Sequence, residues 1–519
     1  MTSFHTTRAP SGCPFTGAAV AASPSSAPLG PGVRPLRELA ELPLLQSRSG
    51  TSFTRLLRKD RLRFLHELAQ GGDLFRVRLF DKTPIVVTGP AQVHECLVER
   101  NADTHKDPLM RHITYPVLGE GLITSSGPLW RRQRRIMAPL FPPSAIAGYA
   151  ADIIGCTEHS LRGWRDGSTL DLVREATHIT MNIAGKILLG VDMFAESDEL
   201  AEALREVLFW TGEKLDSAVP FVQLAVRQLV ARVAEKIAAS RPRLARLAQR
   251  AVRRLEQPIL LPTERDRRVR AAVALLDRRV QRMVDERRST GGPQGDLLGR
   301  LLAARDEDGG QLDDKQLRDE ILTLFVAGHE TTAMSLAFTL SLLCRHPEIY
   351  RQARAQVDAL GRLPTYDDLP RLELLLRCFK ESMRLYPPIP ILIRETERDI
   401  ALGGYRIPRD SVLLISPYAT QHRADLWKEP EVFDPDRFLP AAEAARPRHA
   451  FLAFSTGPRI CLGMHLALME GPLVLATLLQ RYDFALPDHA PLVAEVREAL
   501  RPRGGVPLRI RRRPRSATA

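Results

Sequence analysis

One cysteine lies among residues that suit a metal ligand. Cys461 is part of the stretch FSTGPRICLG, residues 454–463, and it precedes an apolar run from Met464 to about Arg481 that has the pattern of a helix. A sulfur atom at a helix N-terminus faces unpaired N–H groups and the positive end of the helix dipole, which favour the thiolate. Because the thiolate is the form that ligates metals, the position predicts a metal-binding cysteine.

The neighbours of Cys461 narrow the kind of group that it would bind. Gly457 and Gly463 allow a tight turn and a close, flat approach of the backbone to a ligand. Arg459 carries a fork of donors that suits a carboxylate. A single thiolate, N–H groups directed at sulfur, bare backbone and a carboxylate clamp together describe the proximal side of a haem.

The other cysteines give no competing pattern. The six cysteines, at positions 13, 96, 156, 344, 378 and 461, have no paired spacing, so neither a zinc site nor a disulfide framework is expected. A reducing compartment, the cytoplasm, is therefore the expected location.

The cysteine stretch and four further motifs resemble the cytochrome P-450 superfamily, in the form of a stand-alone bacterial-type member. Phe454, Gly457, Arg459, Cys461 and Gly463 match its Phe-x-x-Gly-x-Arg-x-Cys-x-Gly signature. AGHETT (327–332) is similar to its oxygen-activation groove, KESMR (380–384) to its Glu-x-x-Arg pair, FDPDRF (433–438) to the motif of its later arginine, and WRRQR (130–134) to its Trp-x-x-x-Arg clamp. The motifs occur in the family's order, and the resemblance runs from about residue 33 to 510.

The resemblance implies haem b, with Cys461 as the axial ligand of the iron and with Phe454 and Gly463 in the same cofactor-binding loop. The residues that it implies as holders of the two propionates are Trp130, Arg134, Arg394 and Arg459. Arg394 rests only on its place after the Glu-x-x-Arg helix. Three further residues would form an ion network behind the loop that serves folding and haem retention, namely Glu381, Arg384 and Arg437.

The motif AGHETT lies in the middle of a predicted long helix, residues 312–345. Glu330 and Thr331 match the acid–alcohol pair that delivers protons to dioxygen in the family, whereas His329 is read as a neighbour of that pair. Gly328 costs about 1 kcal/mol relative to alanine in a helix interior. Two explanations of this glycine stay open, tight packing against another helix or a groove that admits a ligand.

The resemblance implies a monooxygenase, an oxidoreductase that acts on paired donors and incorporates molecular oxygen. It would use O2 and two electrons from a separate ferredoxin or flavodoxin with its reductase to hydroxylate a lipophilic substrate. Alternatives are a peroxide-driven or non-oxygenating haem enzyme of the same fold, and a non-catalytic haem carrier or sensor. Glu330 and Thr331 favour the first. Arg131, Arg132 and Arg135 are either a docking surface for the redox partner or a solvated helix face.

The expected architecture is mainly α with small β-sheets, a cytochrome P-450 fold in a single haem domain over residues 33–510. A β-hairpin is predicted over 74–89, a second β region over 395–416 and a helix over 464–481. The flanks are read as a disordered Ala/Ser/Pro-rich tail, 1–32, and a basic tail, 511–519. A long basic stretch, about 221–270, is read as a lid or an insertion rather than a membrane-surface helix, and peripheral membrane contact is left open.

Composition limits the partners. The formal charge is +13, which suggests an acidic partner, but nucleic-acid binding is not expected because the aromatic fraction is only 6%. No run of about 18 apolar residues occurs, so no membrane span is expected. A monomer is expected, and the substrate is left open among fatty acids, terpenes, steroids and polyketide-like molecules.

Overall fold

The computed structural model describes residues 36–190, 193–217, 219–240, 263–290, 296–307, 309–487, 491–497 and 499–514. The predicted tail 1–32, residues 515–519 and the middle of the basic stretch, 241–262, lie outside the described residues.

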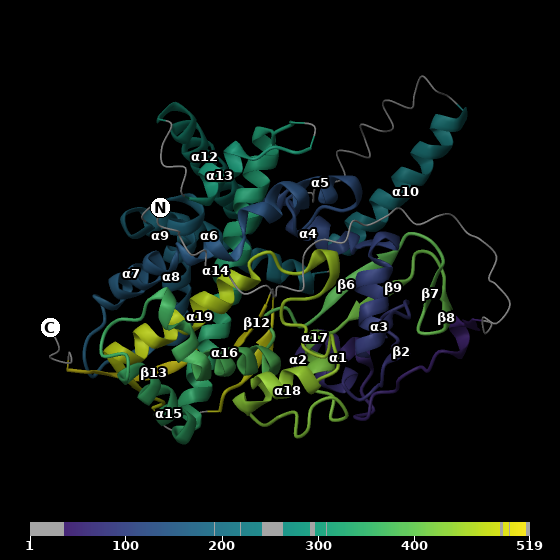
Figure 1. Ribbon diagram of the computed structural model, residues 1–519. Coiled ribbons are helices and arrows are strands. Elements are labelled where there is room, and N and C mark those ends of the chain that lie inside the picture. The colour runs from purple at the N-terminus through teal and green to yellow at the C-terminus, as the bar shows by residue number, and fades with distance from the viewer. Residues whose placement is uncertain are drawn as a thin grey trace, which may run out of the picture.

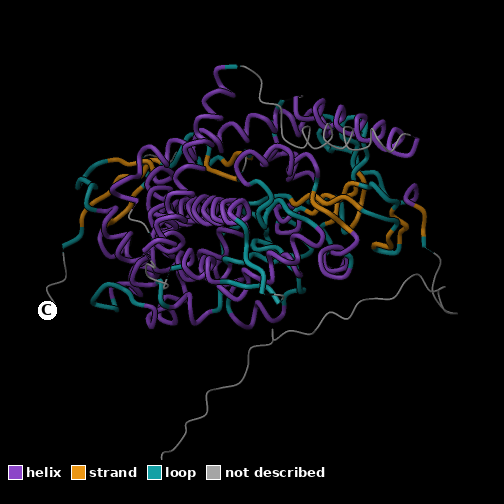
Figure 2. Tube along the Cα trace, turned by 90° about the horizontal axis from the view of Figure 1, so that it is seen from above, coloured by secondary structure: helices purple, strands orange, loops and turns teal. Residues whose placement is uncertain are grey.

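Helices form most of the molecule, with β6, β7, β8 and β9 (residues 392–415) at one side of them and β13 (Pro507–Arg512) at the other (Figures 1 and 2). The helices of the N-terminal half are α1 (Phe53–Lys59), α2 (Arg61–Leu68), α3 (Pro90–His94), α4 (Pro108–Leu118), α5 (Gly127–Met137), α6 (Pro143–Ala147), α7 (Ala150–Leu161), α8 (Leu172–Ala184), α9 (Met193–Asp216) and α10 (Val219–Ser240). Those that follow are α12 (Glu264–Thr290), α13 (Leu297–Ala303), α14 (Asp314–Arg345), α15 (Pro347–Asp358), α16 (Glu373–Leu385), α17 (Pro417–Gln421), α18 (Pro440–Ala445) and α19 (Met464–Arg481). The prediction of a mainly α fold with small sheets is confirmed.

The largest sheet has the strand order β2-β3-β9-β6-β4. Its strands are β2 (Leu74–Arg76), β3 (Ile85–Val87), β4 (Thr104–Lys106), β6 (Leu392–Thr396) and β9 (Val412–Ile415). β2 and β3 pair antiparallel, which confirms the hairpin predicted over 74–89. The sheet joins segments that are about 300 residues apart, because β4 pairs with β6 and places Lys106 opposite Arg394.

Three smaller sheets complete the β structure. The first has the order β1-β8-β7, the second β10-β13-β5, and the third pairs β11 with β12. Their strands are β1 (Arg37–Glu38), β5 (Thr169–Asp171), β7 (Ile400–Leu402), β8 (Tyr405–Ile407), β10 (Tyr482–Ala485), β11 (Ala494–Val496), β12 (Leu500–Pro502) and β13 (Pro507–Arg512). β13 continues two residues beyond the predicted domain end, since Arg512 donates to the carbonyl of Trp164 and the hydroxyl of Tyr482.

α14 is the central helix of the core. Asp313 caps its N-terminus in a capping box with Gln316, and it ends before Pro347, as the sequence predicts. It packs against α8, α16 and α19, and most of the side chains of its second half are buried. By length and composition it passes a test for a membrane span, but 67% of its apolar window is buried inside the protein. A core helix of a soluble fold has the same composition.

The basic stretch predicted over 221–270 begins in α10 and ends in α12. α10 follows α9 in the chain, contacts α4 and α9, and extends away from the body of the protein (Figure 1). His112 of α4 and Gln223 of α10 share a hydrogen bond of 3.1 Å. Four aliphatic side chains of α10 are exposed at helical spacing, Val222, Val226, Leu229 and Val233.

Candidate active site

The cysteine loop has a backbone that requires glycine at one position. Gly457 has φ +74°, and a Cβ there would lie 2.4 Å from the carbonyl oxygen of Leu97. The loop closes on itself, since the N–H of Cys461 donates to the carbonyl of Phe454 at 2.9 Å. Gly463 is the N-cap of α19, and a Cβ there would meet no described atom within 4 Å. The loop therefore packs tightly on one side and leaves room beside Gly463 on the other.

Two opposing influences act on the thiol of Cys461. Burial raises its pKa, whereas the N–H of Gly463 and the charge of Arg134 lower it. The N–H contact agrees with the prediction that the first N–H groups of the helix face the sulfur. Although the thiol lies deep among protein atoms, the residue keeps accessible surface.

Four cationic side chains gather near the cysteine loop. Lys106 and Arg394 lie opposite one another on β4 and β6, and Arg134 of α5 acts electrostatically on Arg459 and on Cys461. Burial, together with Arg394 and Arg134, lowers the pKa of Arg459 to about 9. Within the described part of the chain, none of the four forms an ion pair with a carboxylate. Buried cations that repel one another need anions to offset them.

Trp130 contributes its ring to this cluster. The guanidinium carbon of Arg459 lies 4.0 Å from the centroid of the Trp130 ring, a cation–π contact. The same guanidinium donates to the carbonyl of Ser125 at 3.2 Å through both of its terminal nitrogens. The structure thus brings together Trp130, Arg134, Arg394 and Arg459, the four residues that the sequence predicts as holders of the propionates.

Lys106 is a member of the cluster that the sequence did not indicate. Burial, with Arg394 and Arg459, places its pKa well below the ordinary lysine value, and its ammonium donates to the carbonyl of Ile123. Its only signal in the sequence is its place in a short strand, residues 104–106, before the Trp-x-x-x-Arg motif. The pairing of that strand with β6 is a long-range contact that no local motif predicts.

These residues fit a haem. Four cations without acidic partners offer charge and donors for two propionates, and Cys461 offers one sulfur ligand on the same side. No described atom lies within 4 Å of a Cβ at Gly463, so the backbone there is open to the close approach of a ligand.

An ion network lies behind the cysteine loop, as predicted. Glu381 and Arg384 are both 0% exposed and share two hydrogen bonds of 2.7 Å. Arg384 also donates to three backbone carbonyls, those of Gln421, Pro430 and Val432, so that all five of its N–H groups are used. Arg437 lies 3.4 Å from the same Glu381 carboxylate. Burial raises the pKa of Glu381, while Arg384 opposes that shift.

Gln421 links this network to the cysteine loop. Its amide nitrogen donates to the carbonyls of Met383 and Arg384 at 3.1 and 2.9 Å. Its amide oxygen accepts the N–H of Leu452 at 2.7 Å, two residues before Phe454. The sequence had not indicated this glutamine. A disturbance of the Glu381–Arg384 pair therefore reaches the segment that carries Cys461.

The AGHETT segment forms the middle of α14. The hydroxyl of Thr331 donates to the carbonyl of Ala327 at 2.8 Å, and that of Thr332 donates to the carbonyl of Gly328 at 3.1 Å. A Cβ at Gly328 would meet Leu188 at 3.8 Å, an ordinary contact, so packing does not require glycine there. Of the two explanations of Gly328, the groove is favoured. Glu330 and Thr331 are adjacent and half-buried, and His329 is buried with its Nδ1 on the carbonyl of Phe325.

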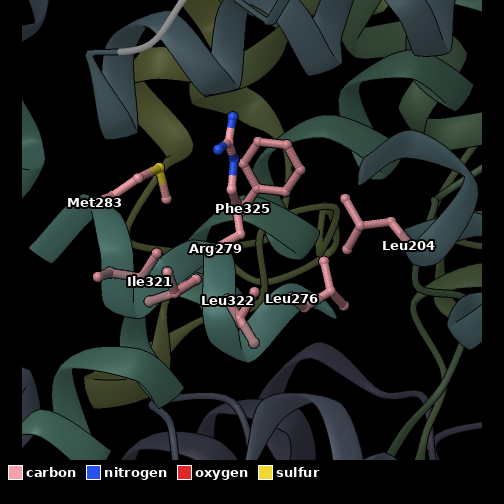
Figure 3. Close-up of a pocket in the computed structure, with 8 residues that line it drawn as sticks. Leu204, Leu276, Arg279, Met283, Ile321, Leu322 and Phe325 are labelled. Carbon is pink, nitrogen blue, oxygen red and sulfur yellow. The ribbon is translucent and has the colours of Figure 1, made fainter. Parts of the chain in front are cut away.

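An apolar hollow between α9, α12 and α14 is distinct from this face (Figure 3). It is lined by Leu204, Leu276, Arg279, Val280, Met283, Ile321, Leu322 and Phe325. Its α14 residues lie on another face of the helix than Thr331, given 3.6 residues per turn. A volume of about 10 Å³ has room for about one water, so the hollow admits no organic substrate.

Two arginines of the predicted docking surface are paired within the chain. Arg132 binds Asp306 at 2.7 Å, and Arg135 binds Glu307 at 2.6 Å, both in the segment between α13 and α14. Arg131, the third, is exposed and forms no ion pair with a carboxylate of the described residues. Folding brings these carboxylates from about 170 residues away, and the docking role of the three arginines stays a prediction.

Comparison with known proteins agrees with this geometry. The family model "Cytochrome P450" matches residues 50–505. Cyclooctat-9-en-7-ol 5-monooxygenase of Streptomyces melanosporofaciens is 33% identical, over 81% of this chain and 84% of its own. Pentalenene oxygenase of Streptomyces avermitilis is 30% identical, over 81% and 86%. The crystal structure of cytochrome P450DA heme domain superposes with a TM-score of 0.76 at 26% identity, covering 93% of this chain and 99% of that one. This chain belongs to the cytochrome P450 family, is a monooxygenase, and uses haem b with a thiolate ligand.

Proposed function

We propose that this monooxygenase hydroxylates a cyclic alkene or alkenol, with Cys461 as the iron ligand and Thr331 and Glu330 as the catalytic pair. The names of two relatives support the substrate class, one an oxygenase of pentalenene and the other a monooxygenase of cyclooctat-9-en-7-ol. The observation that carries the catalytic assignment is the half-buried, adjacent placement of Glu330 and Thr331 on a helix that packs against α19.

The cofactor-binding residues have two roles: one binds the iron and the others hold the propionates. Cys461 supplies the sulfur ligand at the N-terminus of α19, and Phe454 and Gly463 border it in the loop. Arg459, Arg394, Arg134 and Trp130, joined by Lys106, hold the propionates. When bound, haem b with its thiolate supplies the oxidising chemistry.

The protein's own residues handle protons. Thr331 Oγ1 donates to the Ala327 carbonyl and keeps lone pairs with which it orders a water molecule. The Glu330 carboxyl, next to it on α14, takes protons from solvent and passes them to that water. In this proposal the hydroxyl and the carboxyl form a two-step proton relay through that water.

The partners follow from the reaction. A P450 monooxygenase takes up O2, a lipophilic substrate and electrons from a redox partner. We propose a separate ferredoxin or flavodoxin with its reductase as that partner. A monomeric state and a cytoplasmic location stay predictions.

The test uses pentalenene and cyclooctat-9-en-7-ol as probes, with a redox partner and reductant supplied. We expect a hydroxylated product that carries one oxygen atom from labelled O2. Thr331→Ala should bind haem, substrate and O2, consume reductant, and release more hydrogen peroxide and less product. Loss of such a donor typically costs on the order of 100-fold.

Two outcomes would contradict the proposal. Equal product per reductant in wild type and Thr331→Ala would make Thr331 a packing residue and favour peroxide-driven chemistry. Failure of both cyclic probes to shift the haem spectrum, while a long-chain fatty acid shifts it, would contradict the substrate class.

A further inference from the structure

We propose that Asp319 and Glu320 of α14 are positioning residues for the haem-propionate clamp, and that they act through the loop of residues 119–125. The inference rests on the propionate roles proposed above for Lys106 and Arg459. It goes beyond them because neither acid touches the clamp itself.

The two acids hold the loop by its backbone N–H groups. Asp319 accepts the N–H of Glu120 at 2.9 Å, and Glu320 accepts the N–H of Leu122 at 3.0 Å. Asp319 is 2% exposed and Glu320 is 0% exposed. Buried carboxyl groups that accept backbone N–H groups on alternate residues fix both the position and the orientation of the segment.

Two glycines allow the loop to approach α14 this closely. A Cβ at Gly119 would lie 2.1 Å from Asp319 Oδ1, and a Cβ at Gly121 would lie 2.1 Å from Thr323 Oγ1. Gly119 also has φ +49°. Any other residue at position 121 would push the loop away from the helix.

The far half of the same loop holds two cations of the clamp by its carbonyl groups. Lys106 donates to the carbonyl of Ile123, and Arg459 donates to the carbonyl of Ser125 at 3.2 Å. The hydroxyl of Thr124 bonds the carbonyls of Gly119 and Gly121 at 2.8 and 3.0 Å, which ties the two halves together. Thr124 is buried.

The middle of α5 is joined to the loop as well. Gln133 donates to the carbonyl of Glu120 at 2.6 Å and accepts the hydroxyl of Ser125 at 2.6 Å. Gln133 is buried and precedes Arg134. The carbonyl groups of one short loop and the side chain of one glutamine thus place three members of the clamp.

The charges along this path are ordered. The two carboxyl groups accept N–H groups in the first half of the loop, and the two cations donate to carbonyl groups in its second half, so polar contacts hold both halves. Asp319 also binds Lys315 at 2.9 Å and Arg318 at 2.9 Å. Burial raises the pKa of Glu320 to about 8, the N–H of Leu122 opposes the shift, and Asp319 adds to it. Whatever its charge, Glu320 acts on the loop as the acceptor of the Leu122 N–H.

The experiment compares haem-loaded variants by the rate of haem transfer to apomyoglobin at pH 7, the melting temperature, and the propionate bending bands in the resonance Raman spectrum. Glu320→Ala removes the acceptor and Glu320→Gln keeps it. Gly121→Ala displaces the loop without altering an acid or a cation. Matched controls are Asp266→Ala, a buried carboxylate that binds Trp210 at 2.7 Å, and Gly155→Ala, where a Cβ meets no described atom within 4 Å.

We expect Glu320→Ala and Gly121→Ala to lose haem about 10- to 100-fold faster, the range seen when outer-shell partners are removed. Their propionate bands should shift. Glu320→Gln should match wild type in the rate of haem loss and in the propionate bands, because it keeps the hydrogen-bond acceptor. The contrast between Glu320→Gln and Glu320→Ala therefore tests the hydrogen bond itself. The controls should change the melting temperature at most.

The proposal is overturned if Glu320→Ala and Gly121→Ala melt earlier but keep wild-type haem loss and propionate bands, or if Glu320→Gln behaves like Glu320→Ala. If Gly121→Ala does not fold, the two Glu320 variants decide the question. Lys106→Met distinguishes a failure of this proposal from a failure of the propionate clamp on which it rests. If Lys106→Met loses haem faster and Glu320→Ala does not, the clamp stands and the positioning role fails, whereas slow haem loss in Lys106→Met contradicts the clamp.

Discussion

At the scale of single residues, Cys461 shows how one side chain is made into a ligand by its surroundings. The Gly463 N–H and Arg134 oppose the rise in thiol pKa that burial causes. A bound metal ion then removes the proton outright. Two other cysteines differ: burial raises the pKa of Cys96 and of Cys344 to about 12, although Arg394 and Arg345 oppose these shifts. Such thiols are inert.

The first prediction concerns this ligand. Reduced protein under carbon monoxide should show the long-wavelength Soret band typical of thiolate ligation. Cys461→His should move the band to shorter wavelength, because imidazole donates less electron density than thiolate. Cys344→Ser, at a half-buried cysteine whose sulfur donates weakly to the Phe484 carbonyl, should leave the band in place. A wild-type band at the histidine position in freshly folded protein would contradict the assignment.

The second prediction concerns Lys106. Burial and the charges of Arg394 and Arg459 lower its pKa, so the protonated form is disfavoured until an anion arrives. Propionates raise that pKa, haem binding therefore takes up a proton, and haem affinity should fall as pH rises through a window below 10.5, the ordinary lysine pKa. Lys106→Met should lose haem about tenfold faster at pH 7 and lose much of this pH dependence.

The control for this measurement is Lys186→Met, at an exposed lysine of the segment after α8. It should match wild type at every pH. A Lys106→Met protein with the wild-type pH profile of haem loss would show that another group carries the titration.

At the scale of elements, local motifs were sufficient to predict the pieces of the site and insufficient to predict their connections. The helix 464–481 and the long helix with Glu330 and Thr331 follow from apolar periodicity and from stop signals such as Pro347. The hairpin over 74–89 follows from alternation. Each of these signals is contained in a short window of the chain.

What the sequence could not indicate depends on contacts between distant segments. Lys106 joins the clamp because β4 pairs with β6, and Arg132 loses its free charge to Asp306, 174 positions away. Asp319 meets the N–H of Glu120 across 199 positions. Such pairings depend on the packing of whole helices and on strand register, which propensity and periodicity in a single sequence do not determine.

The third prediction concerns α16. Glu381→Ala leaves the Arg384 guanidinium buried without its carboxylate, and breaking a buried pair in this way costs about 3–5 kcal/mol. Because Gln421 connects Arg384 to Leu452, the cysteine loop should be disturbed as well. We expect misfolded or haem-free protein rather than a folded enzyme with slow turnover. Soluble, fully haem-loaded Glu381→Ala, measured by the ratio of haem to protein absorbance, would overturn this role.

The fourth prediction concerns α10 as a lid. Among the described residues, its polar contact with α4 is the hydrogen bond that His112 Nε2 donates to Gln223 Oε1. If α4 and α10 part to admit substrate, Gln223→Ala should raise both the association and the dissociation rate of substrate, by about two- to fivefold for the loss of one net hydrogen bond. Stopped-flow spectral titration measures both rates. Val222→Ala, one residue away and exposed, is the matched control. Unchanged rates in Gln223→Ala would remove the case for a lid held at this point.

At the scale of the whole molecule, some surface charges are paired within the protein and others are free to act on a partner. The chain carries +13, yet many arginines near the surface already face carboxylates, including Arg132 and Arg135 on α5. Pairs of this kind lower the local potential while the net charge stays the same. A positive net charge is therefore a poor guide to where an acidic protein would dock, and exposed, unmatched cations are a better one.

The last prediction applies this distinction to electron delivery. Turnover at limiting ferredoxin should fall as salt rises, because attraction between surface charges is screened over about 8–10 Å near physiological ionic strength. Arg131→Ala should raise the KM for ferredoxin by about two- to fivefold, the size expected of one exposed charge pair. Arg135→Ala should have a smaller effect, since its charge is already matched by Glu307 at 2.6 Å. Both variants should keep the wild-type rate with hydrogen peroxide, which bypasses the redox partner. Salt-independent turnover, or a larger effect of Arg135→Ala than of Arg131→Ala, would place the docking surface on another face of the protein.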